Sequence, residues 1–525
     1  NKPIIKCPTM GGRNAKRHYG STVELDSQAV SDDKAEISSI AKFFLPRLLG
    51  SHAVDRAENE RGSGEVAAWA MDSAAKGPLN LSGAFLGSAL LILATEDAAS
   101  QTEGSDGDGD GDGDAPRVYG LRPSSLLTVS SVFVTLAAAV SMPLFGAIVD
   151  YTPHRKAIGL STAVAIVLLN GAQTFVSSST WPLMLLLLAI SNFLFTIHST
   201  VVLAYLPDLT KDENVLAEYT SWFSIVHFLV VSAYVIVVIL VTAFAGGDTL
   251  YTARMSHVLS FSVATPLLCY AWTRLFRPRP ALHDLPPGKR LLTAGFAELA
   301  ATSKRILGRG TPLPYLRVFM IVLLFSPDAG SGNYISIFIT FMTEQMKMAG
   351  GEIGLVTFFI LLSSIPGSFL STYLCKRFNA LVSFKLCLVW WIVTNALASW
   401  LLSGPDRTHL VYFPFAFMWG VQFGWLFPSQ RVLFCTLIPP GKETELMGMF
   451  SFFGQILGWV APLLFSWINE MGFSLRLGML SSDVLLLTAL VVSAFIDDYD
   501  LAVRQAKALP ESESIRNEEV INLRC

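Results

Sequence analysis

Twelve long apolar runs divide this 525-residue chain, and they constrain its fold more than any other feature. A helix that crosses a bilayer needs about 20 mostly apolar residues, because each residue advances it by about 1.5 Å. Most of the runs are too long for strands in a protein core and are apolar around most of a helix. They lie at approximately 66–96, 124–150, 157–177, 181–206, 219–246, 255–276, 317–345, 352–374, 382–403, 409–437, 445–469 and 476–496. The sequence therefore predicts an all-α membrane protein with 12 transmembrane helices.

The composition excludes an ordinary water-soluble protein. Hydrophobic residues make up 52% of the chain and charged residues only 15%, whereas soluble domains carry roughly 25% charged residues. A soluble fold of this chain would leave large apolar patches in contact with water. The lipid bilayer is therefore the first predicted partner. The weakest of the twelve runs is 66–96, because it contains Asp72, Lys76, Gly77 and Pro78.

The runs fall into two sets of six, separated by a basic and proline-rich stretch. We expect a polar tail, an N-terminal six-helix bundle, a linker, a C-terminal six-helix bundle and a charged tail, at 1–63, 64–276, 277–316, 317–496 and 497–525. If the linker and both termini are cytoplasmic, the inner connections hold fifteen lysines and arginines and the outer connections six. This bias follows the positive-inside rule and predicts that both termini face the cytoplasm.

An internal repeat relates the two halves. Each half contains a glycine followed nine and ten residues later by two cations, and the two copies are Gly146, Arg155, Lys156 and Gly367, Lys376, Arg377. The next inner loops are also similar, since YLPDLTKDENVLAEY and LIPPGKETELMGM both place a proline, a lysine and acidic residues before a helix. The second of these loops contains Lys442, Glu443 and Glu445. Two similar halves around a basic linker are typical of a two-bundle transporter.

The first copy of the repeat lies at the mouth of an apolar run, in the stretch LFGAIVDYTPHRK. We expect Gly146 to let two helices approach closely. Asp150 lies at the membrane boundary, where it can accept hydrogen bonds or pair with a cation. Arg155 and Lys156 either latch one bundle to the other in one conformation or serve only to set the topology.

Polar residues at membrane depth are costly and therefore mark candidate transport sites. Asp72 and Lys76 are four residues apart, so they share a helix face and can pair, and Asn80 continues this face. The face either forms a polar wall of a central cavity or merely begins a shorter helix. His198 and His227 are candidate proton carriers, although lone helix histidines are more often packing residues.

The seventh run contains FSPDAGSGNYISIF, in which proline and glycines weaken the helix near its middle. A broken helix exposes backbone groups that suit a zwitterionic amino acid. Asp328 is therefore a candidate for binding the substrate ammonium or a proton, and Asn333 lies beside it. The alternative is a packing kink in which the carboxyl group is hydrogen-bonded locally.

Three further polar residues lie on the last spans. Gln422 and Gln455 are uncharged donors and acceptors that suit a ligand, although helix packing explains such residues more often. Asp483 is expected to face a neighbouring helix near the outer side.

Several stretches carry a family resemblance. GAIVDYTPHRK is similar to the loop signature of the major facilitator superfamily. Trp69 and Asp72 in WAMDSAA resemble the first-helix opening of the autophagy-related protein 22 (Atg22-like) branch of that superfamily, the vacuolar amino-acid effluxers. The remaining matches are YLPDL, FIDDYDLAVRQA and, most specifically, IPPGKETELMGMFSFFGQILGWVAPLLFSWINEMGFSLRLGML. The resemblance covers about 66–506 and implies a 6+6 two-bundle major facilitator fold.

The resemblance also implies a function. We expect a secondary-active transporter that works by alternating access and exports neutral amino acids from a vacuole- or lysosome-like store to the cytoplasm. Protons are a possible coupling ion. The alternatives are a symporter for a sugar or another small metabolite, and a non-transporting membrane sensor or scaffold.

The sequence contains no signal for an enzyme. We find no phosphate-binding Walker loop, no cluster with the spacing of metal ligands and no motif for a cofactor. The basic residues concentrate in connecting loops, where membrane orientation explains them without nucleic acid.

Overall fold

The computed structural model describes residues 63–103, 117–205, 209, 213–281, 285, 290–308, 311, 313–326, 331–404, 411–439 and 443–508. Helices make up the regular structure of this part of the chain, apart from one isolated bridge between Val118 and Leu121. The predicted all-α fold class is therefore confirmed.

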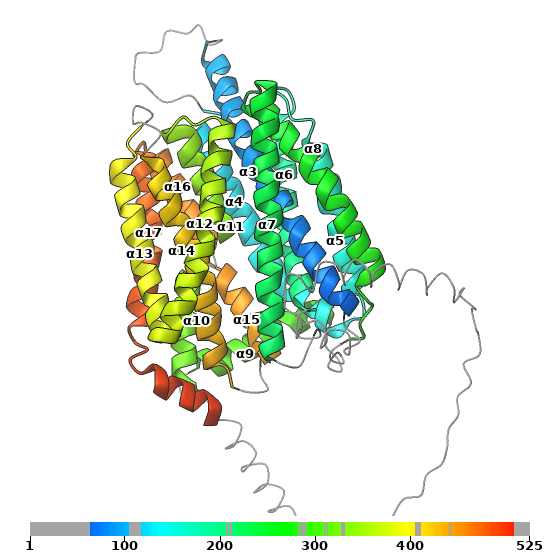
Figure 1. The fold of residues 1–525 in the computed structure, drawn as a ribbon, viewed down its shortest axis with the longest axis vertical. Helices are drawn as coiled ribbons and strands as arrows, with labels where there is room; N and C mark the ends of the chain where they lie inside the picture. The colour runs from blue at the N-terminus through cyan, green and yellow to red at the C-terminus, as the bar shows by residue number, and fades with distance from the viewer. Residues whose placement is uncertain are drawn as a thin grey trace, which may run out of the picture. The chain divides into compact units, whose positions relative to one another are not determined.

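The helices of the first predicted half begin with one long helix, α3 (Ser63–Glu103) (Figure 1). They continue with η1 (Pro123–Ser125), α4 (Leu126–Tyr151), α5 (Arg155–Gln173), α6 (Trp181–Leu203), α7 (Glu213–Ala245), α8 (Thr249–Tyr270) and the π-helical turn η3 (Ala271–Leu275). Helix α9 (Leu291–Leu307) lies in the predicted linker.

The second predicted half follows the linker helix. It consists of α10 (Pro314–Phe325), α11 (Ser331–Thr340), the π-helical turn η5 (Phe341–Gln345), α12 (Gly350–Arg377), α13 (Ala380–Leu401), α14 (Tyr412–Leu437), α15 (Glu443–Gln455), α16 (Val460–Glu470) and α17 (Leu475–Ser493). Figure 1 shows α5, α6 and α8 on one side of the view and α13, α16 and α17 on the other.

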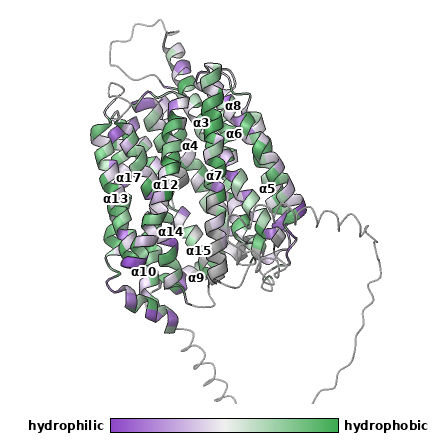
Figure 2. Cartoon of the chain, in the orientation of Figure 1, coloured by the Kyte–Doolittle hydropathy of each residue, from purple (hydrophilic) through white to green (hydrophobic). Residues whose placement is uncertain are grey.

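Nine helical segments in the described part of the chain are long and apolar enough to cross a membrane. They are α3, α4, α5, α6, part of α7, α12, α13, the α15–α16 pair and α17. The other expected spans are α8, α14 and the α10–α11 pair, and the total of twelve stays a prediction. Figure 2 shows mostly hydrophobic residues along the helices. Helix α8 contains buried Ser256, His257 and Ser260, and α14 contains buried Gln422 and Gln430, so polar interior groups lower their mean hydropathy.

The weakest predicted span is the most enclosed helix. Helix α3 continues through Pro78 without ending, and 78% of its most apolar stretch is buried inside the protein. It packs against α6, α7, α8 and α11. Gly77 faces Val231 of α7, and Gly87 faces Leu127 of α4 and Ile339 of α11. Protein rather than lipid surrounds this helix, which explains how it tolerates charged residues.

Two predicted spans are interrupted. Helix α10 ends at Phe325, and Ser326 has an extended backbone just before the proline and glycines that predicted weakness in the seventh span. Asp328 lies outside the described residues. The eleventh span is also broken, because α15 ends at Gln455 and α16 begins at Val460. The sequence analysis did not predict this second break.

Helices α12 and α14 pack through glycine. A Cβ atom at Gly367 would collide with the carbonyl oxygen of Val421, and one at Gly424 would collide with that of Ser364. The close approach therefore requires glycine at these positions, as it does in many membrane helix pairs. The expected close approach at Gly146 is not seen among the described residues, since none of those on other elements has an atom within 4 Å of a Cβ built there. The two copies of the repeat thus use their glycines differently.

The two repeat glycines give a matched test. We expect Gly367→Ala to destabilise the protein by about 1–3 kcal/mol, since the new methyl group displaces backbone of α14. Gly146→Ala should leave stability unchanged or slightly raise it, since alanine is the better helix residue and meets open space. The unfolding temperature of the detergent-solubilised protein measures both. Equal unfolding temperatures for the two variants would contradict the assignment of the close contact to Gly367.

Candidate functional site

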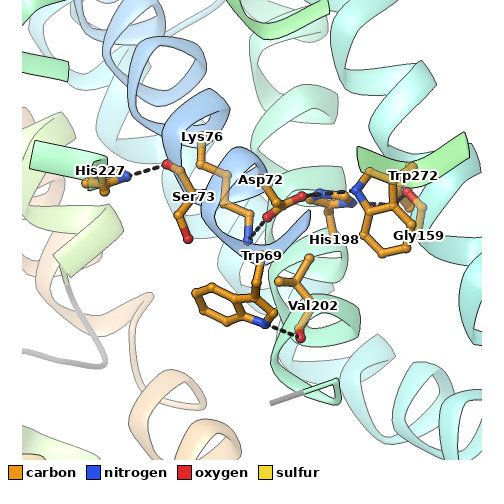
Figure 3. Close-up of polar contacts among 10 residues, drawn as sticks. Trp69, Asp72, Ser73, Lys76, Gly159, His198, Val202, His227 and Trp272 are labelled. Atoms are coloured by element: carbon orange, nitrogen blue, oxygen red, sulfur yellow. Dashed lines mark hydrogen bonds and ion pairs between the residues drawn. The ribbon is translucent and has the colours of Figure 1, made fainter. Parts of the chain in front are cut away.

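A fully buried carboxylate lies on α3 in the first half. Asp72 of α3 forms an ion pair with Lys76, at 2.6 Å between Oδ2 and Nζ. Its other oxygen, Oδ1, accepts hydrogen bonds from His198 Nε2 of α6 at 2.8 Å and from Trp272 Nε1 of η3 at 3.0 Å (Figure 3). Three donors from three elements therefore compensate one carboxylate that has no exposed surface.

The second ring nitrogen of His198 has a partner that suits both forms of the imidazole. Nδ1 lies 2.9 Å from the hydroxyl oxygen of Thr162 on α5. That hydroxyl also lies within hydrogen-bonding distance of the carbonyl oxygens of Ile158 and Gly159. Thr162 can donate to a neutral ring, or donate to its own helix and accept from a protonated ring. The site can therefore hold a proton on His198 without breaking the contact to Asp72.

Small and aromatic residues position this network. The ring of Trp272 occupies the space that a side chain at Gly159 would fill, so glycine in α5 admits the indole. Trp69, one turn before Asp72, stacks on Phe223 at 4.5 Å and donates from Nε1 to the carbonyl oxygen of Val202 at 3.1 Å. These contacts connect α3 to α6 and α7 on either side of the carboxylate.

The Asp72–Lys76 pair was predicted from spacing, and the structure contains it. The alternative, in which the pair begins a shorter helix, is wrong because α3 starts at Ser63 and Asp72 lies nine residues inside it. Lys76 keeps 13% of its side chain exposed, and Asn80 one turn further is exposed. These two residues share the open face of an otherwise enclosed helix.

His227 lies outside this network. Its Nδ1 donates to the carbonyl oxygen of Ser73 at 2.8 Å, and its ring edge lies against Gly77. The interaction connects α7 to α3, as the packing interpretation predicted.

A second buried network was not predicted from the sequence. Asn170 of α5 donates to Ser82 of α3 at 2.8 Å and contacts His257 Nδ1 of α8 at 3.0 Å. Ser260 of α8 donates to the amide oxygen of Asn170 at 2.8 Å. Thr162 and Trp272 of the first network were missed as well. The available signal was polar residues on apolar helices, but nothing in the spacing indicates which of them meet.

The candidate residues of the second half do not form a hydrogen-bond network like that of Asp72 within the described part of the chain. Gln422 of α14 is buried, and neither amide atom has a hydrogen-bond partner among the described residues. Gln455 is half-buried at the end of α15, beside the helix break. Asn333 lies in the first turn of α11, and its side chain lies outside the described residues. The structure does not bring Gln422 or Gln455 into contact with Asp72.

The two copies of the loop motif also differ. Arg155 is 1% exposed, donates from Nη1 to the carbonyl oxygen of Ala204 at 3.0 Å and lies over the ring of Tyr205 at 5.4 Å. Lys156 reaches the carbonyl oxygen of Thr273 at 3.4 Å. Both cations therefore hold α5 to its own half in this conformation. A latch between the halves stays a prediction.

The two cations of the second copy are exposed. Lys376 and Arg377 lie on the surface, and Arg377 lies over the ring of Phe378 at 5.6 Å. Ser371, at the position of Asp150, bonds to Ser429 of α14 at 2.8 Å. The side chains of Asp150, Glu443 and Glu445, and the whole of Lys442, lie outside the described residues.

Polar side chains join the two halves at the end where α4 begins. Asn469 of α16 donates to the hydroxyl groups of Ser124 and Ser125, each at 2.7 Å. Ser466 of α16 donates to Thr128 of α4 at 2.5 Å. We call these five residues the α4–α16 seam. The repeat motif follows the other end of α4, so the seam and the motif lie at opposite ends of that helix.

An acidic residue extends the seam. Glu470 accepts the backbone N–H of Arg122 at 2.8 Å and pairs with the guanidinium group of Arg117 at 3.1 Å. At the same end, the N–H of Gly350 in α12 donates to Thr249 of α8 at 3.2 Å. The sequence analysis missed these residues, because contacts between distant loops leave no periodic signal.

Comparison with protein families finds one match over most of the chain. A family model described as "Vacuole effluxer Atg22 like" matches residues 62–225 and 220–507. Autophagy-related protein 22 of Cryptococcus neoformans is 22% identical over 191 residues, which cover 34% of this chain and 33% of that protein. Autophagy-related protein 22-2 of Emericella nidulans is 24% identical over 277 residues, 48% of this chain and 45% of that protein. The chain thus aligns with less than half the length of these relatives.

Solved structures with the same fold are membrane transporters. The human organic anion transporter MFSD10 is 14% identical with a TM-score of 0.55, over 83% of this chain and all of that chain. A D-xylose–proton symporter is 12% identical with a TM-score of 0.56, over 82% of this chain and 98% of its own. The nucleoside transporter NupG is 15% identical with a TM-score of 0.53, over 82% and 100%. These neighbours confirm the major facilitator fold.

The buried ion pair predicts that a double variant without either charge is more stable than a single variant that keeps the lysine. Asp72→Asn leaves Lys76 without its counter-charge, and breaking a buried pair in this way costs about 3–5 kcal/mol. The double variant Asp72→Asn/Lys76→Met removes both charges, so we expect it to recover a large part of that loss. Unfolding temperatures and the folded yield after extraction measure the difference. If the double variant is as unstable as the single variant or more so, the ion pair does not account for the role of Asp72.

Proposed function

The chain belongs to the Atg22-like vacuole effluxer family, and on that premise we propose that it exports neutral amino acids from a vacuole- or lysosome-like store to the cytoplasm. It is a membrane transporter rather than an enzyme, as its family and its structural neighbours are. The amino-acid substrate, the direction of transport and the vacuolar membrane are the proposed parts. The low identity to transporters of sugars, nucleosides and anions supports the shared fold alone.

The observation that carries the proposal is the open face of α3 beside the Asp72 network. A neutral amino acid presents one carboxylate and one ammonium group. Lys76 is the network's accessible cation, and its Nζ lies 5.7 Å from the ring centroid of Trp69. It can bind the substrate carboxylate while Asp72 holds the lysine in place. The amide oxygen of Asn80, one helical turn away, can accept from the ammonium group.

The apolar surroundings favour neutral side chains on the substrate. Trp69, which is half-buried and stacks on the buried Phe223, lies beside Lys76. Aromatic surfaces stabilise an apolar substrate side chain by removing it from water. The described part of the chain offers Lys76 and Asn80 on this face, with no further charge on α3 between Asp72 and Thr95 to pair a charged substrate side chain.

The seam supports alternating access. Under the cation bias of the loops, the α4–α16 seam lies on the lumenal side and the repeat motif on the cytoplasmic side. The structure would then represent a form that is closed to the lumen. Transport requires the seam to open, so that the halves rock relative to each other. His198 and the undescribed Asp328 remain candidates for coupling this motion to a proton.

A transport assay separates the proposed substrates. Purified protein in liposomes should move labelled leucine and tyrosine, and should not move xylose or uridine. The Lys76→Met variant should reduce amino-acid flux at least about tenfold, since losing a hydrogen bond to a charged group costs about 1.5–3 kcal/mol. Flux of xylose or uridine without leucine would favour a sugar or metabolite carrier instead. No flux of any solute by folded protein would favour a sensor or scaffold.

Covalent closure of the seam tests alternating access. Thr128 and Ser466 are in hydrogen-bond contact across the halves, so Thr128→Cys/Ser466→Cys places two thiols face to face. We expect oxidation to abolish nearly all flux and a reductant to restore it, because the disulfide blocks the opening of that end. The two single variants, treated with the same oxidant, control for the native cysteines. Full flux in the cross-linked protein would show that the seam does not open during transport.

A further inference from the structure

A second buried carboxylate lies in the other half of the molecule and has a very different environment. Asp483 of α17 is 9% exposed and lies eight residues after Leu475, about 12 Å along the helix axis. Its Oδ1 accepts a hydrogen bond from the side-chain amide of Asn395 at 2.8 Å. Its Oδ2 is buried and has no hydrogen-bond partner among the described residues. One carboxylate oxygen is therefore left open.

The surrounding hydrogen bonds orient the amide. Trp419 of α14 donates from Nε1 to Asn395 Oδ1 at 3.2 Å. The amide oxygen of Asn395 is thereby committed to the indole, and its nitrogen must point to Asp483. A chain of side chains thus runs from α14 through α13 to α17. It ends on the carboxyl group of Asp483, which accepts one hydrogen bond from the neutral amide of Asn395.

The contrast with Asp72 indicates what this carboxyl group does. Asp72 has a lysine, a histidine and an indole as donors, so its negative charge is compensated. In the described part of the chain, no lysine, arginine or histidine forms an ion pair with Asp483. Tyr334 of α11 interacts electrostatically with Asp483, and its phenol can carry only a negative charge. A permanent charge on Asp483 would therefore be uncompensated.

The other charged or titratable groups on elements packed against α17 lie towards its ends. Lys385 donates to the carbonyl oxygen of Ile496, and Tyr315 donates to Asp497, both beyond the C-terminal end of α17. The remaining charged groups lie near its beginning or on the first turn of α10, and they are Glu344, Glu470, Arg476 and Arg317. The thiol of Cys387 on α13 is buried and donates to the carbonyl oxygen of Gln422. None of them supplies the missing counter-charge.

We propose that Asp483 is a proton-binding site of the transport cycle. Binding a proton forms an O–H bond on Oδ2 and removes the buried negative charge, while Asn395 continues to donate to Oδ1. Releasing the proton restores a charge that the low-dielectric interior disfavours unless the surroundings rearrange. The inference rests on the proposed transport function only for its role in flux, because proton binding itself requires no substrate.

The packing shows how this proton could affect the rest of the molecule. Trp419 lies on α14, the helix that packs against α12 through Gly367 and Gly424. The ring of Trp419 also meets Phe338 of α11 edge-on, with centroids 5.7 Å apart. Helix α11 forms the second part of the seventh span. A change of hydrogen bonding at Asp483 is thus connected through Asn395 and Trp419 to α14 and α11.

Infrared difference spectroscopy tests proton binding on the purified protein without substrate. Near neutral pH, where exposed Asp and Glu side chains are already ionised, the wild type should show a protonated-carboxyl band that disappears at alkaline pH, and Asp483→Asn should lack it. Glu470→Gln, which removes a carboxylate at the end of α16, should keep the band. The same band in wild type and Asp483→Asn would overturn the proposal. If Asp483→Asn does not fold, Asp483→Glu should shift the band in position or in titration range, and an unchanged band would overturn the proposal.

Flux measurements test the role of the proton. In liposomes, leucine transport by the wild type should respond to an imposed pH gradient, and transport by Asp483→Asn should lose this response. A full response in Asp483→Asn, with loss of the response in His198→Gln, would assign the coupling to His198 and overturn the proposal. If the wild type moves no leucine, the proposed substrate fails, while the infrared result still decides whether Asp483 binds a proton.

Discussion

The need to compensate a buried charge governs the first half of this protein. Asp72 lies within a helix of a membrane-embedded bundle, where an uncompensated carboxylate is very costly. Its partners come from its own helix, from α6 and from η3, while Thr162 of α5 holds the far side of His198. Each of these elements must be in place before the charge is satisfied. The network therefore specifies how four elements pack, which apolar contact alone does not do in lipid.

Small residues make the same arrangement possible. Gly159 admits the ring of Trp272, and without that ring one of the donors to Asp72 would be lost. In the second half, Gly367 and Gly424 bring α12 and α14 into backbone contact. Both cases follow from one physical fact: lipid-facing helices gain little from hydrophobic association, so close packing and interior hydrogen bonds supply the specificity.

The two halves share the repeat of a glycine followed nine and ten residues later by two cations, but the repeat residues make different contacts in each half. Arg155 is buried and tied to Ala204, whereas Lys376 and Arg377 are exposed. The first half pairs its buried carboxylate with a lysine and two hydrogen-bond donors, and the second leaves Asp483 with one donor. Such asymmetry suits a carrier in which one half holds the substrate and the other half binds and releases a proton.

The sequence by itself determined the helical membrane fold, the family and the pairing of Asp72 with Lys76, because these depend on local composition, motif and a spacing of four residues. It also predicted the break in the seventh span from its proline and glycines. Only the tertiary structure decided that His198 and Trp272 meet Asp72, and that Asn469 bridges the halves. These contacts join residues more than a hundred positions apart on helices whose rotation and depth no local pattern specifies. For the same reason the span predicted to be the weakest proved to be the most enclosed of the nine candidate spans: hydropathy measures compatibility with lipid, and α3 is surrounded by protein.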